Sequence, residues 1–119
     1  MSKTIKDTAE IFKALGDETR LKIIKLIAAT GNQLCVGMIA HKLGVSQPAV
    51  SQHLKTLKNA GLIVSEREGI YFHHKISDDF LAPFGIDTDS FLKSFGAELD
   101  LTLSCENMAD TNGCDIING

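Results

Sequence analysis

Apolar residues recur at helical spacing over the first quarter of the chain, and they predict two successive helices. The first apolar stripe ends before Gly16 and belongs to a helix that needs a partner surface: Ile5, Ala9, Phe12 and Leu15. Asp17 is a suitable N-cap for a second helix, whose apolar residues are too dense for a half-exposed position. We therefore place these residues of the second helix in the core: Leu21, Ile23, Ile24, Leu26 and Ile27.

Residues 35–61 have the pattern of two short helices joined by a tight turn. Gly44 is placed to end the first helix in a left-handed conformation, and Ser46 is placed to cap the second. Pro48 falls in the first turn of the second helix, where no amide donor is missed, and Gly61 ends that helix. This arrangement is the outline of a DNA-reading helix-turn-helix unit.

The second helix of this unit has one apolar face, formed by Val50, Leu54 and Leu57. Its other face carries amides, hydroxyls and ammonium groups but no carboxylate, which is the chemistry that base edges and phosphates require. We expect these residues to contact DNA: Ser46, Gln47, Ser51, Gln52, Lys55 and Lys58. The alternative is an ordinary helical hairpin whose polar face is only solvated.

After Gly61 the pattern changes toward the alternation of strands, which predicts a hairpin from residue 62 to residue 76 with a charged tip at residues 65–69. A lone hairpin is not stable, so it must pack on the helices and project its tip as a wing. We expect Arg67 to contact a phosphate or the minor groove, with plain solvent exposure as the alternative. His73 and His74 point to opposite faces of the strand and are interpreted as packing residues, not metal ligands.

The last apolar stripe predicts a helix capped by Asp89 that has little of its own domain to cover. Its apolar residues are Phe91, Leu92, Phe95, Leu99 and Leu103. We expect it to pair with the first helix across a twofold axis, so that a homodimer reads an inverted-repeat operator with half-sites about 34 Å apart. Residues 1–104 then form one domain, and the polar residues 105–119 form a flexible tail.

The formal charge of −3 over 119 residues hides a strong asymmetry. Residues 1–76 contain 11 Lys and Arg against 6 Asp and Glu, whereas residues 77–119 contain 1 against 9. The helix pair lies in the basic part, as nucleic-acid binding requires. We find no signal peptide, membrane span or catalytic motif, so we expect a soluble cytoplasmic protein that is not an enzyme.

Three cysteines, none of them in a CxxC pair, argue against a disulfide scaffold and a finger-type zinc site. Cys105 and Cys114 lie in the polar tail, and Cys35 is a candidate third thiol, unless it is only a small buried residue. Three thiolates suit a soft ion such as arsenite or antimonite. A disulfide or sulfur-bridged link formed under oxidant or sulfide stress is the alternative, and an iron–sulfur centre ranks third.

Residues 8–76 resemble the arsenic-repressor (ArsR/SmtB) family of winged helix-turn-helix repressors. The resemblance rests on three runs in order, FKALGDETRLKIIKLI, LCVGMIAHKLGVSQPAVSQHLKTLKNAGLI and EREGIYFHHKI. It implies a mainly α fold with a small β-hairpin, a homodimer through its first and last helices, and release from an operator by a metal, metalloid or thiol oxidant. It places Gln47, Ser51 and Gln52 against bases and Arg67 in the wing.

The chain departs from the family's pattern at three places. Arsenic sensors have a Cys-x-Cys pair where this chain has Leu34-Cys35-Val36-Gly37, and residues 87–104 contain none of the histidines that zinc-type sensors use. Wings often carry arginine where this chain has Ile70. We therefore expect DNA binding that requires no cofactor, with a cysteine-bound metalloid as inducer, while a winged-helix protein-interaction module is the alternative function class.

Overall fold

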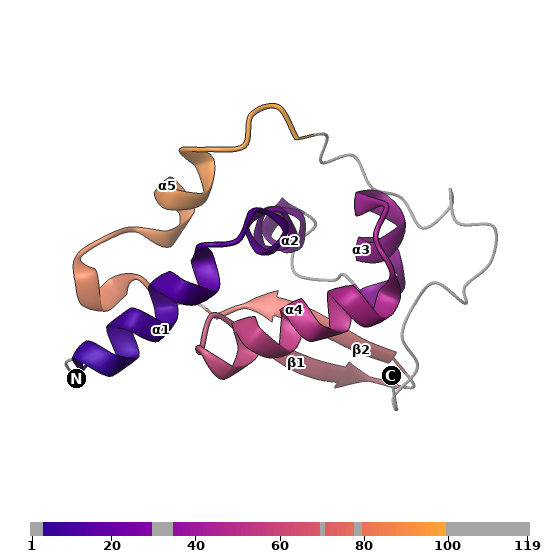
Figure 1. Ribbon diagram of the computed structural model, residues 1–119, viewed down its shortest axis with the longest axis horizontal. Coiled ribbons are helices and arrows are strands. Elements are labelled where there is room, and N and C mark those ends of the chain that lie inside the picture. The colour runs from indigo at the N-terminus through magenta and orange to yellow at the C-terminus, as the bar shows by residue number, and fades with distance from the viewer. Residues whose placement is uncertain (1–3, 30–34, 70, 78–79, 100–119) are drawn as a thin grey trace.

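The computed structural model describes residues 4–29, 35–69, 71–77 and 80–99. It is mainly helical with one two-stranded antiparallel hairpin, as the sequence predicts (Figure 1). In chain order its elements are α1 (Ile5–Leu15), α2 (Glu18–Ala29), α3 (Val36–Leu43), α4 (Gln47–Asn59), β1 (Ile63–Glu68), β2 (Tyr71–Ile76), the short 3-10 helix η1 (Ala82–Phe84) and α5 (Thr88–Lys93).

Helix α2 forms the centre of the core. It is seen nearly end-on in the middle of Figure 1, with the other helices and the hairpin around it. Asp17 accepts a hydrogen bond from the Arg20 backbone N–H at 3.0 Å, so the predicted N-cap is confirmed. Ile23, Ile24, Leu26 and Ile27 are completely buried, as expected, and each such side chain contributes about 1.5–3 kcal/mol to folding.

Helix α1 begins with a capping box, in which Thr4 and Asp7 each accept a hydrogen bond from the other's backbone N–H. It packs on the core through Ile11, Ala14 and Leu15. The predicted apolar stripe is only partly buried in the protomer, because the side chains of Ile5 and Phe12 are 90% and 60% exposed. The protomer therefore leaves part of this apolar face uncovered, which agrees with the expected need for a partner surface.

Helices α3 and α4 form the predicted helix-turn-helix unit. Gly44 has a left-handed conformation with φ of 69°, and the Ser46 hydroxyl accepts a hydrogen bond from the Ala49 N–H at 3.2 Å. At the other end of α4, Gly61 has φ of 80° and Leu62 donates to the Leu57 carbonyl at 3.0 Å. Local sequence signals thus fix both ends of the reading helix.

The hairpin packs against α4 and α2, and its register pairs Ile63 with Ile76, Ser65 with His74, and Glu68 with Tyr71. The prediction of a charged tip at residues 65–69 is wrong, because β1 continues to Glu68 and the turn begins at Gly69. Cross-strand interactions explain the longer strand, since Lys75 forms a 3.1 Å ion pair with Glu66.

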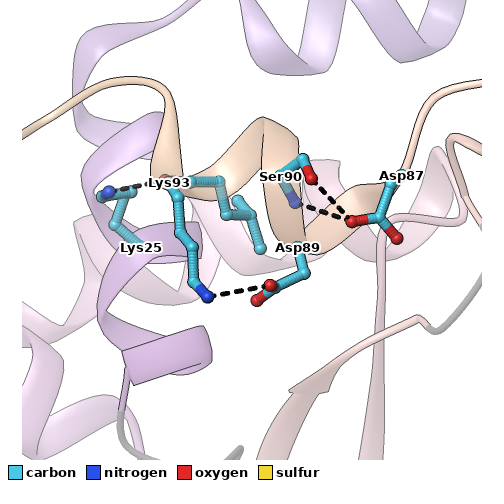
Figure 2. Close-up of polar contacts among 6 residues, drawn as sticks. Lys25, Asp87, Asp89, Ser90 and Lys93 are labelled. Atoms are coloured by element: carbon cyan, nitrogen blue, oxygen red, sulfur yellow. Dashed lines mark hydrogen bonds and ion pairs between the residues drawn. The ribbon is translucent and has the colours of Figure 1, made fainter.

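Helix α5 is shorter than the sequence predicts. Asp87, not Asp89, is its N-cap and accepts hydrogen bonds from the Ser90 N–H and hydroxyl at 2.9 Å (Figure 2). These bonds, the backbone N–H first, hold the pKa of the Asp87 carboxyl below its usual value. The helix ends at Lys93 because Lys25 Nζ donates hydrogen bonds to the Leu92 and Phe95 carbonyls. Gly96 then adopts a left-handed conformation with φ of 80°. Leu103 lies outside the described residues.

Candidate nucleic-acid interface

The outer face of α4 presents the polar residues that the sequence singles out. Val50, Leu54 and Leu57 anchor the inner face, with 0%, 4% and 0% of their surfaces exposed. The six predicted contact residues are all exposed: Ser46, Gln47, Ser51, Gln52, Lys55 and Lys58. None of them is acidic, so the face can donate hydrogen bonds to base edges and neutralise phosphates without competing carboxylates.

Arg67 is exposed on β1, opposite Phe72 and two residues before the turn. Alternate residues share a face of a strand, so Arg67 lies on the same face as Ser65 and the core residue Ile63. That face is the one that packs on the helices. The exposed Arg67 therefore lies on the helix-facing side of the hairpin, and its contact with DNA stays a prediction.

Arg20 joins three helices, and sequence analysis did not identify it. Its Nε donates to the Ala14 carbonyl at 2.7 Å and its Nη2 donates to the Lys13 carbonyl at 3.2 Å, both at the end of α1. Its Nη1 lies 3.3 Å from Nδ1 of His53 on α4. The backbone N–H of Arg20 also lowers the pKa of the Asp17 carboxyl, and the nearby guanidinium charge adds to this. The sequence hint of this role is the position of a cation, Arg20, in the first turn of the helix that follows the break at Gly16.

Among the described residues His74 is a buried polar residue of the core, at 8% exposed, whereas His73 on the other face of β2 is half-buried. This confirms that the two rings point to opposite faces. Burial lowers the pKa of His74 to about 4, with the charges of Lys58 and His73 adding to the shift, so the ring is neutral at pH 7. Its Nδ1 lies 3.0 Å from the Ser65 hydroxyl on the paired strand.

Cys35 is completely buried and extended at the residue before α3. Its position is that of a small core residue, while Cys105 and Cys114 lie outside the described residues. Within the described ranges no three His, Cys, Asp or Glu side chains gather closely enough to hold a metal ion. The helices of the described ranges are also too short or too polar to cross a bilayer.

Comparison with known proteins agrees with this geometry. Residues 17–65 match the family described as bacterial regulatory protein, arsR family. Over 71 residues the chain is 48% identical to an uncharacterized HTH-type transcriptional regulator of Methanocaldococcus jannaschii, covering 60% of this chain and 79% of that protein. It is 40% identical over 68 residues to the arsenical resistance operon repressor of Escherichia coli, covering 57% of each.

A solved structure supports the same assignment. The homodimeric winged helix-turn-helix DNA-binding domain of a possible ArsR-family regulator from Mycobacterium bovis has a TM-score of 0.59 and 30% identity, covering 67% of this chain and 72% of that one. The sequence similarity and the exposed carboxylate-free face of α4 lead to one conclusion. The chain belongs to the arsR family of bacterial regulatory proteins and is a DNA-binding winged helix-turn-helix regulator of transcription.

Proposed function

We propose that this protein is a homodimeric repressor that binds an inverted-repeat operator in duplex DNA and is released by a thiol-reactive inducer. The observation that carries the proposal is the outer face of α4, where six polar or cationic side chains are exposed and none is acidic. Such a face suits the acceptor-rich major groove and the phosphates beside it. DNA binding in the cytoplasm then needs no bound cofactor.

The residues divide by the part of DNA that their chemistry fits. Gln47, Ser51 and Gln52 carry amides and a hydroxyl that can both donate and accept, so they read base edges. Lys55, Lys58 and Arg67 are cations and contact phosphates, which position the protein without reading sequence. Ser46, exposed at the start of α4, lies where a helix N-terminus favours a phosphate.

An uncovered apolar surface supports the homodimer. Ile5 and Phe12 of α1 are exposed, and Ile86 is 44% exposed. The Phe12 ring centroid lies 6.2 Å from that of Phe84, the last residue of η1. Apolar side chains in one patch are stabilised by a second copy. The segment before α5 thus joins α1 in the proposed seam. Helix α5 covers more of its own domain than the sequence predicts, because Leu92 is buried in the protomer's core. A twofold axis there presents two copies of α4 to half-sites about 34 Å apart.

We propose that residues 1–104 form the DNA-binding and dimerisation domain and that the inducer acts on thiols of the tail, residues 105–119. Cys105 and Cys114 are available as soft ligands for arsenite or antimonite. The name of the Escherichia coli relative, an arsenical resistance repressor, favours this chemistry. Cys35 joins the site only if the start of α3 opens, because its side chain is completely buried.

A second inducer class uses the same residues. Two thiols that meet can form a disulfide or a sulfur-bridged link, with an oxidant or a persulfide accepting the two electrons. The metalloid is favoured only by the relative's name, so the two inducers need a direct comparison. Titrating the reduced protein with arsenite must produce a thiolate-to-arsenic ultraviolet band and loss of free thiols. Neither change would occur if the switch is purely oxidative.

The DNA-binding half of the proposal is tested by the salt dependence of binding. Fluorescence anisotropy with operator and random duplexes at 50 and 200 mM salt should show affinity falling steeply, because phosphate contacts release counterions. The operator complex should remain the tighter one at both salt concentrations. Absence of binding, or binding that does not respond to salt, would instead support a winged-helix module that binds protein.

A further inference from the structure

A cleft of about 370 Å³ lies between α4 and the hairpin. That volume is within the range of about 300–1,000 Å³ that small-molecule sites occupy. Its polar lining comes from three elements: Ser51, Lys55, Lys58 and Asn59 on α4, Ser65 on β1 and His74 on β2. The cleft thus lies along the edge of the proposed DNA-reading face, where α4 meets the wing.

One group in the lining lacks a hydrogen-bond partner. The Ser65 hydroxyl lies 3.0 Å from Nδ1 of His74, but Nε2 of the same ring is buried and has no partner among the described residues. A buried polar atom without a partner destabilises the protein, so a ligand that accepts a hydrogen bond from this ring is favoured. If the hydroxyl donates to Nδ1, the neutral ring carries its proton on Nε2 and offers a donor.

The charge around the cleft is positive. Lys55 and Lys58 are exposed at its rim, and none of its lining residues that the structure describes carries a carboxylate. Glu66 is next to Ser65 in sequence but pairs with Lys75 on the other face of the hairpin. Arg67 lies on the cleft's side of β1, roughly 7 Å beyond Ser65 along the strand. These charges repel a cation and attract an anion.

We propose that this cleft is a phosphate-binding site in which Lys55 and Lys58 supply the charge and the Ser65–His74 pair supplies a neutral donor. Lys55 and Lys58 form charge-assisted hydrogen bonds with the anion. In the bound form an oxygen of the anion accepts the Nε2–H of His74, which is covered in the free protein, while Ser65 holds the ring in the tautomer that donates. The site selects an oxyanion over chloride because several donors converge from different sides.

Two sources can supply the phosphate group. A phosphodiester of the DNA backbone fits the position beside α4, and this source rests on the proposed DNA-binding function. A small phosphorylated molecule fits the same chemistry without DNA. In the first case the site positions the wing on the duplex, and in the second case the ligand competes with the duplex for Lys55 and Lys58.

The test follows the imidazole of His74 by ¹H–¹⁵N NMR at pH 7 in the full-length protein. Adding inorganic phosphate should shift the His74 signals with saturation, and the ¹⁵N shifts should identify the Nε2–H tautomer. Sodium chloride at matched ionic strength should leave these signals in place. Absence of saturation, an equal response to chloride, or the Nδ1–H tautomer in the phosphate-bound protein would overturn the proposal.

Substitutions then locate the phosphate. Lys58→Gln removes an exposed charge without touching the core and should weaken phosphate binding roughly fivefold, the size expected for one partly exposed charge contact. Ser65→Ala should release the tautomer preference of His74 and weaken binding by a similar factor. Lys6→Gln, an exposed lysine on α1, is the matched control and should bind phosphate like the unmodified protein. Equal binding by all three variants would exclude the cleft.

A duplex titration of the same sample distinguishes the sources. Duplex that shifts the His74 signals and is displaced by phosphate identifies the backbone phosphodiester as the ligand. In the other case the duplex binds without shifting the His74 signals, and phosphate still shifts them. This result identifies a small phosphorylated molecule as the ligand. Failure of the duplex to bind at all would overturn the proposed DNA-binding function and leave the phosphate result standing, so the two failures are separable.

Discussion

Arg20 of α2 and His53 of α4 meet at 3.3 Å between Nη1 and Nδ1. The same guanidinium holds the Ala14 and Lys13 carbonyls at the end of α1, so one side chain joins α1, α2 and the reading helix. Arginine can do this because its donors are fixed in a planar fork. The orientation of α4 therefore depends on a residue that is not among the predicted DNA contacts.

Replacing Arg20 with Met should destabilise the protein by about 2–3 kcal/mol, because two helix-end carbonyls and His53 lose a charged donor. Urea unfolding at fixed protomer concentration measures the change. Lys22→Met on the same helix is the control, since Lys22 makes only an exposed ion pair with Glu18 and should lose less than about 1 kcal/mol. Equal losses would show that the Arg20 contacts contribute nothing specific.

Replacing Gln52 with Ala should reduce the preference for operator over random duplex by roughly 1–3 kcal/mol, because an amide that reads a base edge is lost. Lys55→Ala should weaken operator and random duplex alike, since a phosphate contact carries no sequence information. Anisotropy titrations with both duplexes separate the two effects. If Gln52→Ala weakens both duplexes equally, α4 does not lie in the groove with this face.

The stability of the protein should fall as the pH is lowered from about 6.5 to about 4. In this window unfolded His74 binds a proton, whereas folded His74, with its pKa lowered to about 4, does not. Stability therefore rises with pH across the window, by up to about 3 kcal/mol, and levels off above it. Urea unfolding at several pH values measures this slope. His74→Phe should flatten the slope, while substitution of the exposed His41 should leave it in place.

Replacing Phe12 with Glu should dissociate the proposed homodimer, because a carboxylate without a partner costs several kcal/mol in an apolar seam. Sedimentation over a range of concentrations measures the assembly state, and DNA affinity should fall although no contact residue is changed. Lys6→Glu, on the same helix, is the control for added charge. A Phe12→Glu protein that remains dimeric would place the seam elsewhere.

Cys105→Ser and Cys114→Ser should leave operator binding intact and abolish release by arsenite, because oxygen is a poor ligand for a soft metalloid. Anisotropy of the operator complex during an arsenite titration measures release. The inducer can release DNA only by as much as it prefers the free dimer, typically 1–3 kcal/mol of coupling. Unchanged release after deletion of residues 105–119 would show that these thiols are not the sensor.

The parts of the fold that depend on neighbours in sequence were predictable. Gly44, Ser46 and Gly61 fix the ends of α3 and α4 through their own backbone preferences, so the helix-turn-helix unit and its exposed face follow from the sequence. The burial of α2 follows equally from its dense apolar residues. These predictions needed no knowledge of what lies across the core.

The parts that depend on distant residues were missed. Arg67 lies in a strand because Ser65 and Glu66 find partners on β2, which the charged run 65–69 does not reveal. The last helix ends early because Lys25, which is far away in sequence, donates hydrogen bonds to the Leu92 and Phe95 carbonyls. The cleft beside His74 also arises only when α4 and the hairpin pack together.

Lys25 and Arg20 lie five residues apart on α2, roughly 7.5 Å along its axis. Lys25 holds the end of α5 and lies 5.1 Å over the Phe95 ring, whereas Arg20 reaches the reading helix. Helix α2 is thus a short, rigid connection between the Lys25 contact with the end of α5 and the Arg20 contact with α4. A displacement that begins beyond α5 can reach α4 through α2 only while the Lys25 and Arg20 contacts are both kept. If either contact breaks, the displacement is not transmitted further. The weaker of these two contacts therefore sets the upper limit on the coupling free energy between the end of α5 and α4.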